Sequence, residues 1–302
     1  MTTTTTPGPT GPADAPGRAR VTTRPTRSAA AASRIALRAL MLRDLVVLRK
    51  HFAEFAVRTL VQPFLLCFVF LFVFPKIGQA VGGGQGGDAA ESAFATVLVA
   101  GVVGISIMFQ GVQSVALQMA QEFGFTREIE DRVQAPCPIW LVAVSKVVSG
   151  TVQGMISAII VLPIASVVHA AGVEAQISLH WLIVLTVVPL SCVAMASLGL
   201  VLGTSFEPRN IGLMFGFVVL PITFLGGTYY QWTRLSPVKI GGWHWLQTLV
   251  LVNPLIYVNE GMRAAFTDAP HMHLYVIYPV LVGFCVLFLG LGLRNFRRRV
   301  LS

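Results

Sequence analysis

The sequence predicts an all-α membrane protein with six transmembrane helices, an N-terminal amphipathic interfacial helix and an external re-entrant helical segment before the last span. Composition is the first reason. Of the 302 residues, 55% are hydrophobic and only 12% are charged, whereas soluble domains carry about 25% charged residues. The mean hydropathy is +0.73. The second reason is a series of apolar runs of about 20 residues, the helix length that crosses about 30 Å of hydrocarbon. These features argue against a soluble enzyme, a disordered protein and a nucleic-acid-binding module.

The N-terminal region divides into two parts before the first apolar run. Residues 1–32 are rich in Thr, Pro, Ala, Gly and Arg, so they bury too little apolar surface to fold, and we expect a disordered cytoplasmic tail. They lack the apolar core of a signal peptide, although their composition would also suit a transit peptide. Residues 33–56 mix basic and apolar side chains at helical spacing. This pattern predicts an amphipathic helix lying in the membrane interface, or else the solvated start of the first span.

Residues 57–302 are predicted to form the transmembrane domain. The six spans are expected at about 57–75, 94–118, 147–168, 181–203, 211–231 and 273–293. With the N-terminus inside, 18 of the 22 Lys and Arg residues fall in cytoplasmic segments. Because basic residues accumulate in cytoplasmic loops, both termini are predicted to be cytoplasmic.

The predicted spans carry no Asp, Glu, Lys, Arg or His near their middle. Proton-coupled transporters and intramembrane metalloenzymes usually need such groups, so both are disfavoured. The four cysteines form no CxxC pair, and the glycine-rich stretch 82–87 lacks the Lys and Ser/Thr of a phosphate-binding loop. We therefore expect no catalytic residue, metal site or cofactor site in this chain. The polar residues of spans two and three either bond neighbouring helices or contact a substrate, and they are Gln110, Gln113, Gln118 and Gln153.

Charged residues are concentrated in the connection between spans two and three. Glu128 and Arg132 are spaced to pair on one face of a helix. A short charged helix of this kind is either a surface that another protein binds or a solvated loop helix. The residues concerned are Glu122, Arg127, Glu128, Glu130, Arg132 and Pro136.

Two further segments are unusual for a simple bundle. The end of span five has two glycines that allow a close helix approach or a break, followed by tyrosines suited to the headgroup level; its notable residues are Phe224, Gly226, Gly227, Tyr229 and Tyr230. The external stretch 232–271 is too apolar for an ordinary loop, yet its apolar run is too short to span, which predicts a re-entrant or interfacial segment. Pro254 suits the first turn of a new helix over 255–266.

Taken together, these elements resemble type-2 ABC transporter permeases over about residues 34–299. The nearest variety is that of the daunorubicin-resistance and nodulation-type export permeases of bacteria. The resemblance rests on an Arg-Glu element leading to a proline (Arg127, Glu128 and Pro136), on Phe-Leu-Gly-Gly-Thr-Tyr at 224–229 and on Asn-Pro-Leu at 253–255. The loop departs from the common Gly-Thr-Leu-Glu form, since it has Arg-Glu-Ile-Glu at 127–130.

The resemblance implies the permease subunit of an ATP-driven exporter, moving an amphiphile such as a drug, lipid or glycan across a bacterial inner or plasma membrane. Such a permease is not an enzyme. ATP and Mg would be bound by a separate ABC ATP-binding subunit that docks on the helix at about 122–140, and a second permease copy or paralogue would complete the pore. The substrate would leave between the outer ends of spans two and five, past Gln110, Gln113, Phe224, Gly226, Gly227, Tyr229 and Tyr230. The external helix would carry Asn253, Pro254, Glu260 and Arg263. The alternatives are a self-sufficient secondary transporter and a membrane-embedded enzyme or scaffold.

Overall fold

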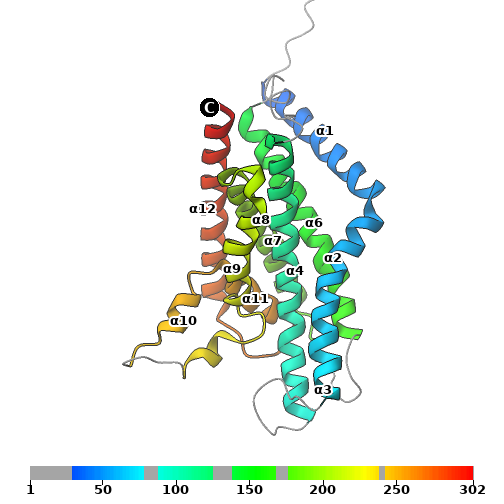
Figure 1. Ribbon diagram of the computed structural model, residues 1–302, viewed down its shortest axis with the longest axis vertical. Helices are drawn as coiled ribbons and strands as arrows, with labels where there is room; N and C mark the ends of the chain where they lie inside the picture. Colours follow the sequence, from blue (N-terminus) through cyan, green and yellow to red (C-terminus); the bar gives the residue numbers. More distant parts are fainter. Residues whose placement is uncertain (1–28, 78–87, 125–137, 168–175, 238–241, 302) are drawn as a thin grey trace, which may run out of the picture.

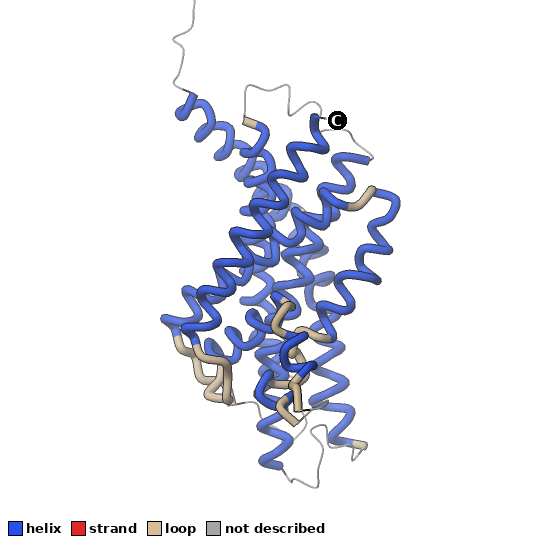
Figure 2. Tube along the Cα trace, turned by 90° about the vertical axis from the view of Figure 1, so that its left-hand side faces the viewer, coloured by secondary structure: helices blue, strands red, loops and turns tan. Residues whose placement is uncertain are grey.

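The computed structural model describes residues 29–77, 88–124, 138–167, 176–237 and 242–301. Within these ranges the regular elements are all helices, which gather into one elongated bundle (Figure 1). The start of α1 and the C-terminus lie at the same end of the bundle (Figure 1). Most of the loops gather at the opposite end (Figure 2).

The larger elements are α1 (Ala29–Lys50), α2 (Phe52–Cys67), α4 (Asp88–Gly124), α6 (Ile139–Val167), α7 (Trp181–Ser205), α11 (Pro254–Phe266) and α12 (Leu274–Leu301). A π-helical stretch, η1 (Phe68–Val73), and the short α3 (Phe74–Lys76) extend α2. The chain after α7 is broken into η2 (Pro208–Asn210), α8 (Ile211–Met214), the π-helical η3 (Phe215–Val219) and α9 (Leu220–Phe224). Two short elements, η4 (Trp232–Leu235) and α10 (Trp245–Val250), precede α11.

The N-terminal region forms two helices. Of the predicted tail 1–32, residues 1–28 lie outside the described part of the chain. Residues 29–32 belong to α1. The predicted interfacial helix 33–56 ends early, because the backbone bends at His51 (φ −107°, ψ 23°) and the chain turns into α2 (Figure 1). Residues 52–56 therefore start the first apolar helix.

The buried side of α2 follows helical spacing. Phe55, Thr59, Pro63 and Cys67 are buried at every fourth position, which places them on one face. Pro63 lacks a backbone N–H and interrupts the regular hydrogen-bond ladder just before the π-helical stretch η1. Helix α2 thus presents one packed face to the bundle and one apolar face outward.

Helix α4 is the centre of the bundle. In its apolar 18-residue stretch, 78% is buried inside the structure. The corresponding share is 22% for the Phe52–Val73 helix and 17% for α12. It packs closely on α7 through glycines, because a Cβ atom on Gly199 would lie 2.8 Å from the Val112 carbonyl oxygen. A Cβ atom on Gly203 would lie 2.9 Å from Ala116 Cα. Small residues allow helix backbones to approach in this way inside a membrane.

Five described helices are long and apolar enough to cross a membrane: Phe52–Val73, Ser92–Gly124, Ile139–Ile164, Trp181–Ser205 and Leu274–Val300. They correspond to the predicted spans 57–75, 94–118, 147–168, 181–203 and 273–293. The predicted continuous span 211–231 is instead the shorter apolar segment Pro208–Phe224. The helix ends at Phe224, and the chain turns back onto α4 through Gly227, which adopts a left-handed conformation (φ +70°).

The segment before the last span, which was predicted to be external, folds into the bundle. All residues of α11 are buried, and the helix packs against α4, α7 and α12 (Figure 1). It begins at Pro254, as predicted, and the Asn253 side chain caps it by accepting a hydrogen bond from the Leu255 N–H at 2.9 Å. The short apolar run that was predicted to be re-entrant or interfacial contains α10, whereas the helix predicted over 255–266 is α11, which lies inside the helical bundle.

Candidate functional site

A buried ion pair ties α4 to α6 beside the connection that was predicted to dock an ATPase. Lys146 Nζ lies 2.6 Å from Glu122 Oε1, and the two side chains are only 3% and 9% exposed. Lys146 also donates a hydrogen bond to Gln118 Oε1 at 3.4 Å. Glu122 thus supports the junction of the two helices. The other predicted docking residues lie outside the described part of the chain: Arg127, Glu128, Glu130, Arg132 and Pro136.

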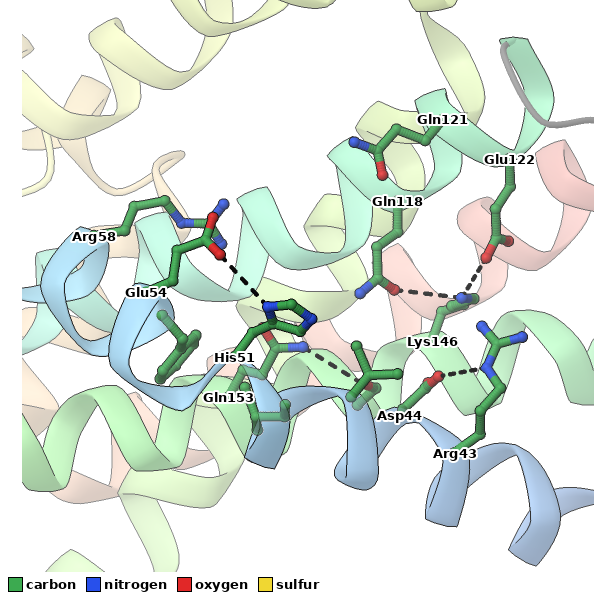
Figure 3. Close-up of a pocket in the computed structure, with 14 residues that line it drawn as sticks. Arg43, Asp44, His51, Glu54, Arg58, Gln118, Gln121, Glu122, Lys146 and Gln153 are labelled. Atoms are coloured by element: carbon green, nitrogen blue, oxygen red, sulfur yellow. Dashed lines mark hydrogen bonds and ion pairs between the residues drawn. The ribbon is translucent and has the colours of Figure 1, made fainter.

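A polar cavity of about 420 Å³ adjoins this ion pair, between the bend at His51 and helices α4 and α6 (Figure 3). Two ion pairs and a contact between a histidine and a carboxylate line it. Besides Lys146 and Glu122, Arg43 Nε lies 3.5 Å from Asp44 Oδ1. His51 Nδ1 lies 3.6 Å from Glu54 Oε2. The remaining polar residues of the lining are Arg58, Gln118, Gln121, Ser149 and Gln153.

A chain of hydrogen bonds runs from α2 through α4 to α6. Thr59 Oγ1 donates to Gln110 Oε1 at 3.1 Å, and Gln110 Nε2 donates to Gln153 Oε1 at 3.2 Å. Gln153 Nε2 donates in turn to Ser149 Oγ at 3.5 Å. Interhelical bonding, one of the two roles predicted for Gln110 and Gln153, is therefore confirmed.

A second cavity of about 220 Å³ lies beside this chain, between α2 and α4. Gln113, which the sequence placed on the substrate path, lines it together with Gln110. Its lining is mixed: amides and hydroxyls face part of it, and Pro63, Ile105 and Phe109 supply an apolar part. The structure thus brings the two predicted glutamines to a hollow near the middle of the bundle.

The predicted outer residues form a different cluster, in which α11 holds the turn that follows α9. Arg263 Nη1 donates to Glu260 Oε1 at 2.9 Å, and both side chains are buried. Arg263 Nη2 also donates to the carbonyl oxygens of Gly227 and, at 3.1 Å, of Tyr230. Glu260 accepts the Trp232 N–H at 3.0 Å. We call Asn253, Asn259, Glu260 and Arg263, together with the turn 222–232 that they bind, the outer clip.

Two asparagines complete the outer clip. Asn253 Nδ2 donates to the Ile222 carbonyl oxygen at 2.7 Å. Asn259 Nδ2 donates to the Gly226 carbonyl oxygen at 2.7 Å and to Thr228 Oγ1 at 3.1 Å. Carbonyl groups left unpaired where the helix ends are satisfied by side chains of α11, so the turn and the helix fix one another.

Burial of the guanidinium lowers the pKa of Arg263, and the neighbouring Glu260 carboxylate opposes that effect. An arginine keeps its charge in proteins. The outer clip therefore contains a permanent cation whose carboxylate and carbonyl partners must all stay in place.

The glycine positions of α4 explain how the turn fits. A Cβ atom on Gly101 would lie 2.2 Å from the Thr228 carbonyl oxygen, and one on Gly104 would lie 2.0 Å from Asn259 Oδ1. Gly226 is equally confined, because its Cβ would lie 2.4 Å from Leu255 Cδ2. The close approach that the two glycines of the turn predicted is made to α11, because a Cβ atom on Gly227 would lie 2.2 Å from Ile256 Cδ1, and Thr228 makes the approach to α4.

The structure places the aromatic residues predicted for the substrate path in different surroundings. Phe224 is 63% exposed on the outside of the helix. The Tyr229 ring packs against Phe70 with 5.4 Å between centroids, and the Tyr230 hydroxyl bonds the Phe224 carbonyl oxygen at 3.4 Å. None of the three lines either cavity described above.

The sequence reasoning missed several residues that the structure brings into these sites. Lys146 and Arg58 contributed only to the distribution of basic residues that predicts the membrane orientation. Asn259 was not predicted to belong to a site. A polar side chain next to Glu260 on an otherwise apolar helix was the available signal for Asn259. For Lys146 there was none, because its partner Glu122 lies on another helix.

Comparison with known proteins agrees with this architecture. A family model described as ABC-2 type transporter matches residues 35–267, from α1 to the end of α11. The chain is 29% identical over 241 residues to the inner membrane transport permease YadH of Escherichia coli strain K12, with 79% of this chain and 87% of the relative covered. A permease of the same name from Shigella flexneri aligns with the same identity and coverage. The chain belongs to the ABC-2 type transporter family, as its resemblance to type-2 ABC permeases predicted.

Proposed function

We propose that this chain is the membrane-spanning permease subunit of an ATP-driven exporter of an amphiphilic substrate. The family match over residues 35–267 is the observation that carries the proposal. Membership in this family implies association with an ABC ATP-binding subunit, which would bind ATP and Mg. A second permease copy or a paralogue would complete the pore. The name of the relative YadH supports a bacterial inner or plasma membrane, and the distribution of Lys and Arg favours cytoplasmic termini.

The ion pair between Glu122 and Lys146 supports a route for the movement. The pair joins α4 to α6 on either side of the connection 125–137, on which the ATP-binding subunit would dock. A buried, charged contact resists separation of two helices, because either charge left alone in the interior would be costly. A push on the connection would therefore move α4 and α6 together, and α4 is the central helix of the bundle.

Movement of α4 would reach the outer clip directly. The turn 222–232 rests on Gly101 of α4, and Asn259 of α11 rests on Gly104. Rocking of α4 would shift the surface on which the turn lies. The substrate would then leave between the outer end of α4 and the segment Pro208–Phe224.

The docking assignment is tested by the double variant Arg127→Ala/Glu128→Ala. We expect at least about tenfold less ATP-binding subunit to be retained on the tagged permease, because contacts to charged groups contribute about 1.5–3 kcal/mol each. The measurement is the ratio of the two proteins after affinity purification in mild detergent. The matched control is Glu207→Ala/Arg209→Ala, which removes an exposed charge pair from another predicted cytoplasmic connection. Equal retention in both variants would contradict docking on the connection 125–137.

A further inference from the structure

Arg43, His51 and Lys146 each lie beside a carboxylate of the 420 Å³ cavity, whereas Arg58 does not. Arg43 contacts Asp44, His51 contacts Glu54, and Lys146 contacts Glu122. Arg58 lies four residues after Glu54 on α2, yet the Glu54 carboxylate contacts His51 instead. Across the described ranges, the Arg58 guanidinium has no carboxylate within 4.0 Å.

Arg58 also occupies a special position between the two cavities. It is the one described residue that lines both the 420 Å³ cavity, shown in Figure 3, and the 220 Å³ cavity. It lies in the first turns of the apolar helix Phe52–Val73. The Arg58 side chain is exposed near the beginning of this helix, where a long basic side chain can reach the membrane interface and the headgroups there.

The chemistry around Arg58 fits an acidic headgroup. A guanidinium binds phosphate or carboxylate with two parallel hydrogen bonds. On one side, Asp44 lines the cavity, and its buried Oδ2 atom has no hydrogen-bond partner among the described residues. On the other side, Gln62 and Gln113 offer amides to further hydroxyls. The neighbouring positions Val61 and Leu65 of α2 are 52% exposed, which provides an apolar surface for a hydrocarbon chain.

We propose that Arg58 binds the acidic group, a phosphate or a carboxylate, of an anionic amphiphile whose headgroup occupies the two cavities. This inference rests on the proposed function and narrows its substrate class. It favours acidic lipids and acidic lipid-linked glycans over cationic drugs.

The test is binding of a fluorescent phosphatidylglycerol to the purified full-length chain in mild detergent, measured by anisotropy. We expect Arg58→Gln to weaken binding at least about tenfold, the effect of losing a charge-assisted contact. Arg58→Lys keeps the positive charge but lacks the planar guanidinium group. Its affinity for phosphatidylglycerol should therefore lie between those of the unchanged protein and Arg58→Gln. The matched control is Arg49→Gln, which removes an exposed arginine of α1 that lines neither cavity. Millimolar inorganic phosphate should compete poorly, because it lacks the hydrocarbon chain.

Three results would overturn the proposal. Equal phosphatidylglycerol binding by Arg58→Gln and the Arg49→Gln control would remove Arg58 from recognition. Tighter binding of dodecylamine or phosphatidylcholine than of phosphatidylglycerol would reverse the charge preference. Inorganic phosphate competing as well as the lipid would show a site for free anions. Each of these would leave co-purification with an ATP-binding subunit unaffected, so a failure here is distinct from failure of the proposed function.

Discussion

Glu260→Ala is expected to destabilise the protein by about 3–5 kcal/mol, the usual effect of removing one partner of a buried ion pair. The variant would leave the Arg263 guanidinium buried without its carboxylate. It would also remove the acceptor of the Trp232 N–H and of the Met272 N–H, which Glu260 Oε2 binds at 2.8 Å. The measurement is the thermal unfolding midpoint of the purified chain in detergent.

Two further variants distinguish the buried network from a general effect of charge removal. Arg234→Ala removes an exposed arginine close to the same turn and should leave the midpoint nearly unchanged. The double variant Glu260→Gln/Arg263→Met removes both charges and should unfold at a higher temperature than Glu260→Ala. If Glu260→Ala unfolds at the same temperature as Arg234→Ala, the outer clip does not hold the turn.

Lys146→Ala is the second change for which we expect a large effect, again about 3–5 kcal/mol. It would remove the Lys146 ammonium group from the Glu122 carboxylate, which is buried between α4 and α6. We also expect ATP hydrolysis by the assembled complex to continue while transport falls, because α4 and α6 would no longer move as one unit. Both quantities are measured on the same reconstituted vesicles.

Arg209→Ala is the matched control for Lys146→Ala, because its ion pair with Glu207 is 81% and 59% exposed and exposed pairs contribute about 0–1 kcal/mol. Glu122→Gln/Lys146→Met removes both charges and should recover stability relative to Lys146→Ala. It should recover the coupling of ATP hydrolysis to transport less fully than it recovers stability, because the two helices regain packing but not the ion pair. A Lys146→Ala protein that is as stable and as well coupled as Arg209→Ala would contradict the proposed route.

Local chemistry explains which parts of the fold were predictable from the sequence. Apolar runs set the five long helices within several residues, because hydrocarbon thickness requires a minimum length. The start of α11 was correct because capping by Asn253 and a proline at the first position are local signals. The end of the segment after α7 was wrong by several residues, because Phe224–Gln231 is apolar enough to continue a helix. Its termination depends on partners more than 30 residues away on α11.

The sites were less predictable, since their residues meet only through tertiary packing. Glu260 and Arg263 were singled out, but nothing in their spacing says that they bind the turn after α9. Glu122 looked like one acid among several in a charged connection, yet its partner Lys146 comes from the next helix. Arg58 became notable only when the pairing of every neighbouring carboxylate was known.

The central claim is that this permease works with a separate ATP-binding subunit. The most direct measurement is purification of the tagged full-length chain from its native membranes in mild detergent, followed by identification and quantification of the proteins that remain bound. We expect an ABC ATP-binding subunit in about a one-to-one ratio with the permease. A lone oligomer of this chain, without an ATP-binding subunit even after crosslinking in the membrane, would contradict it.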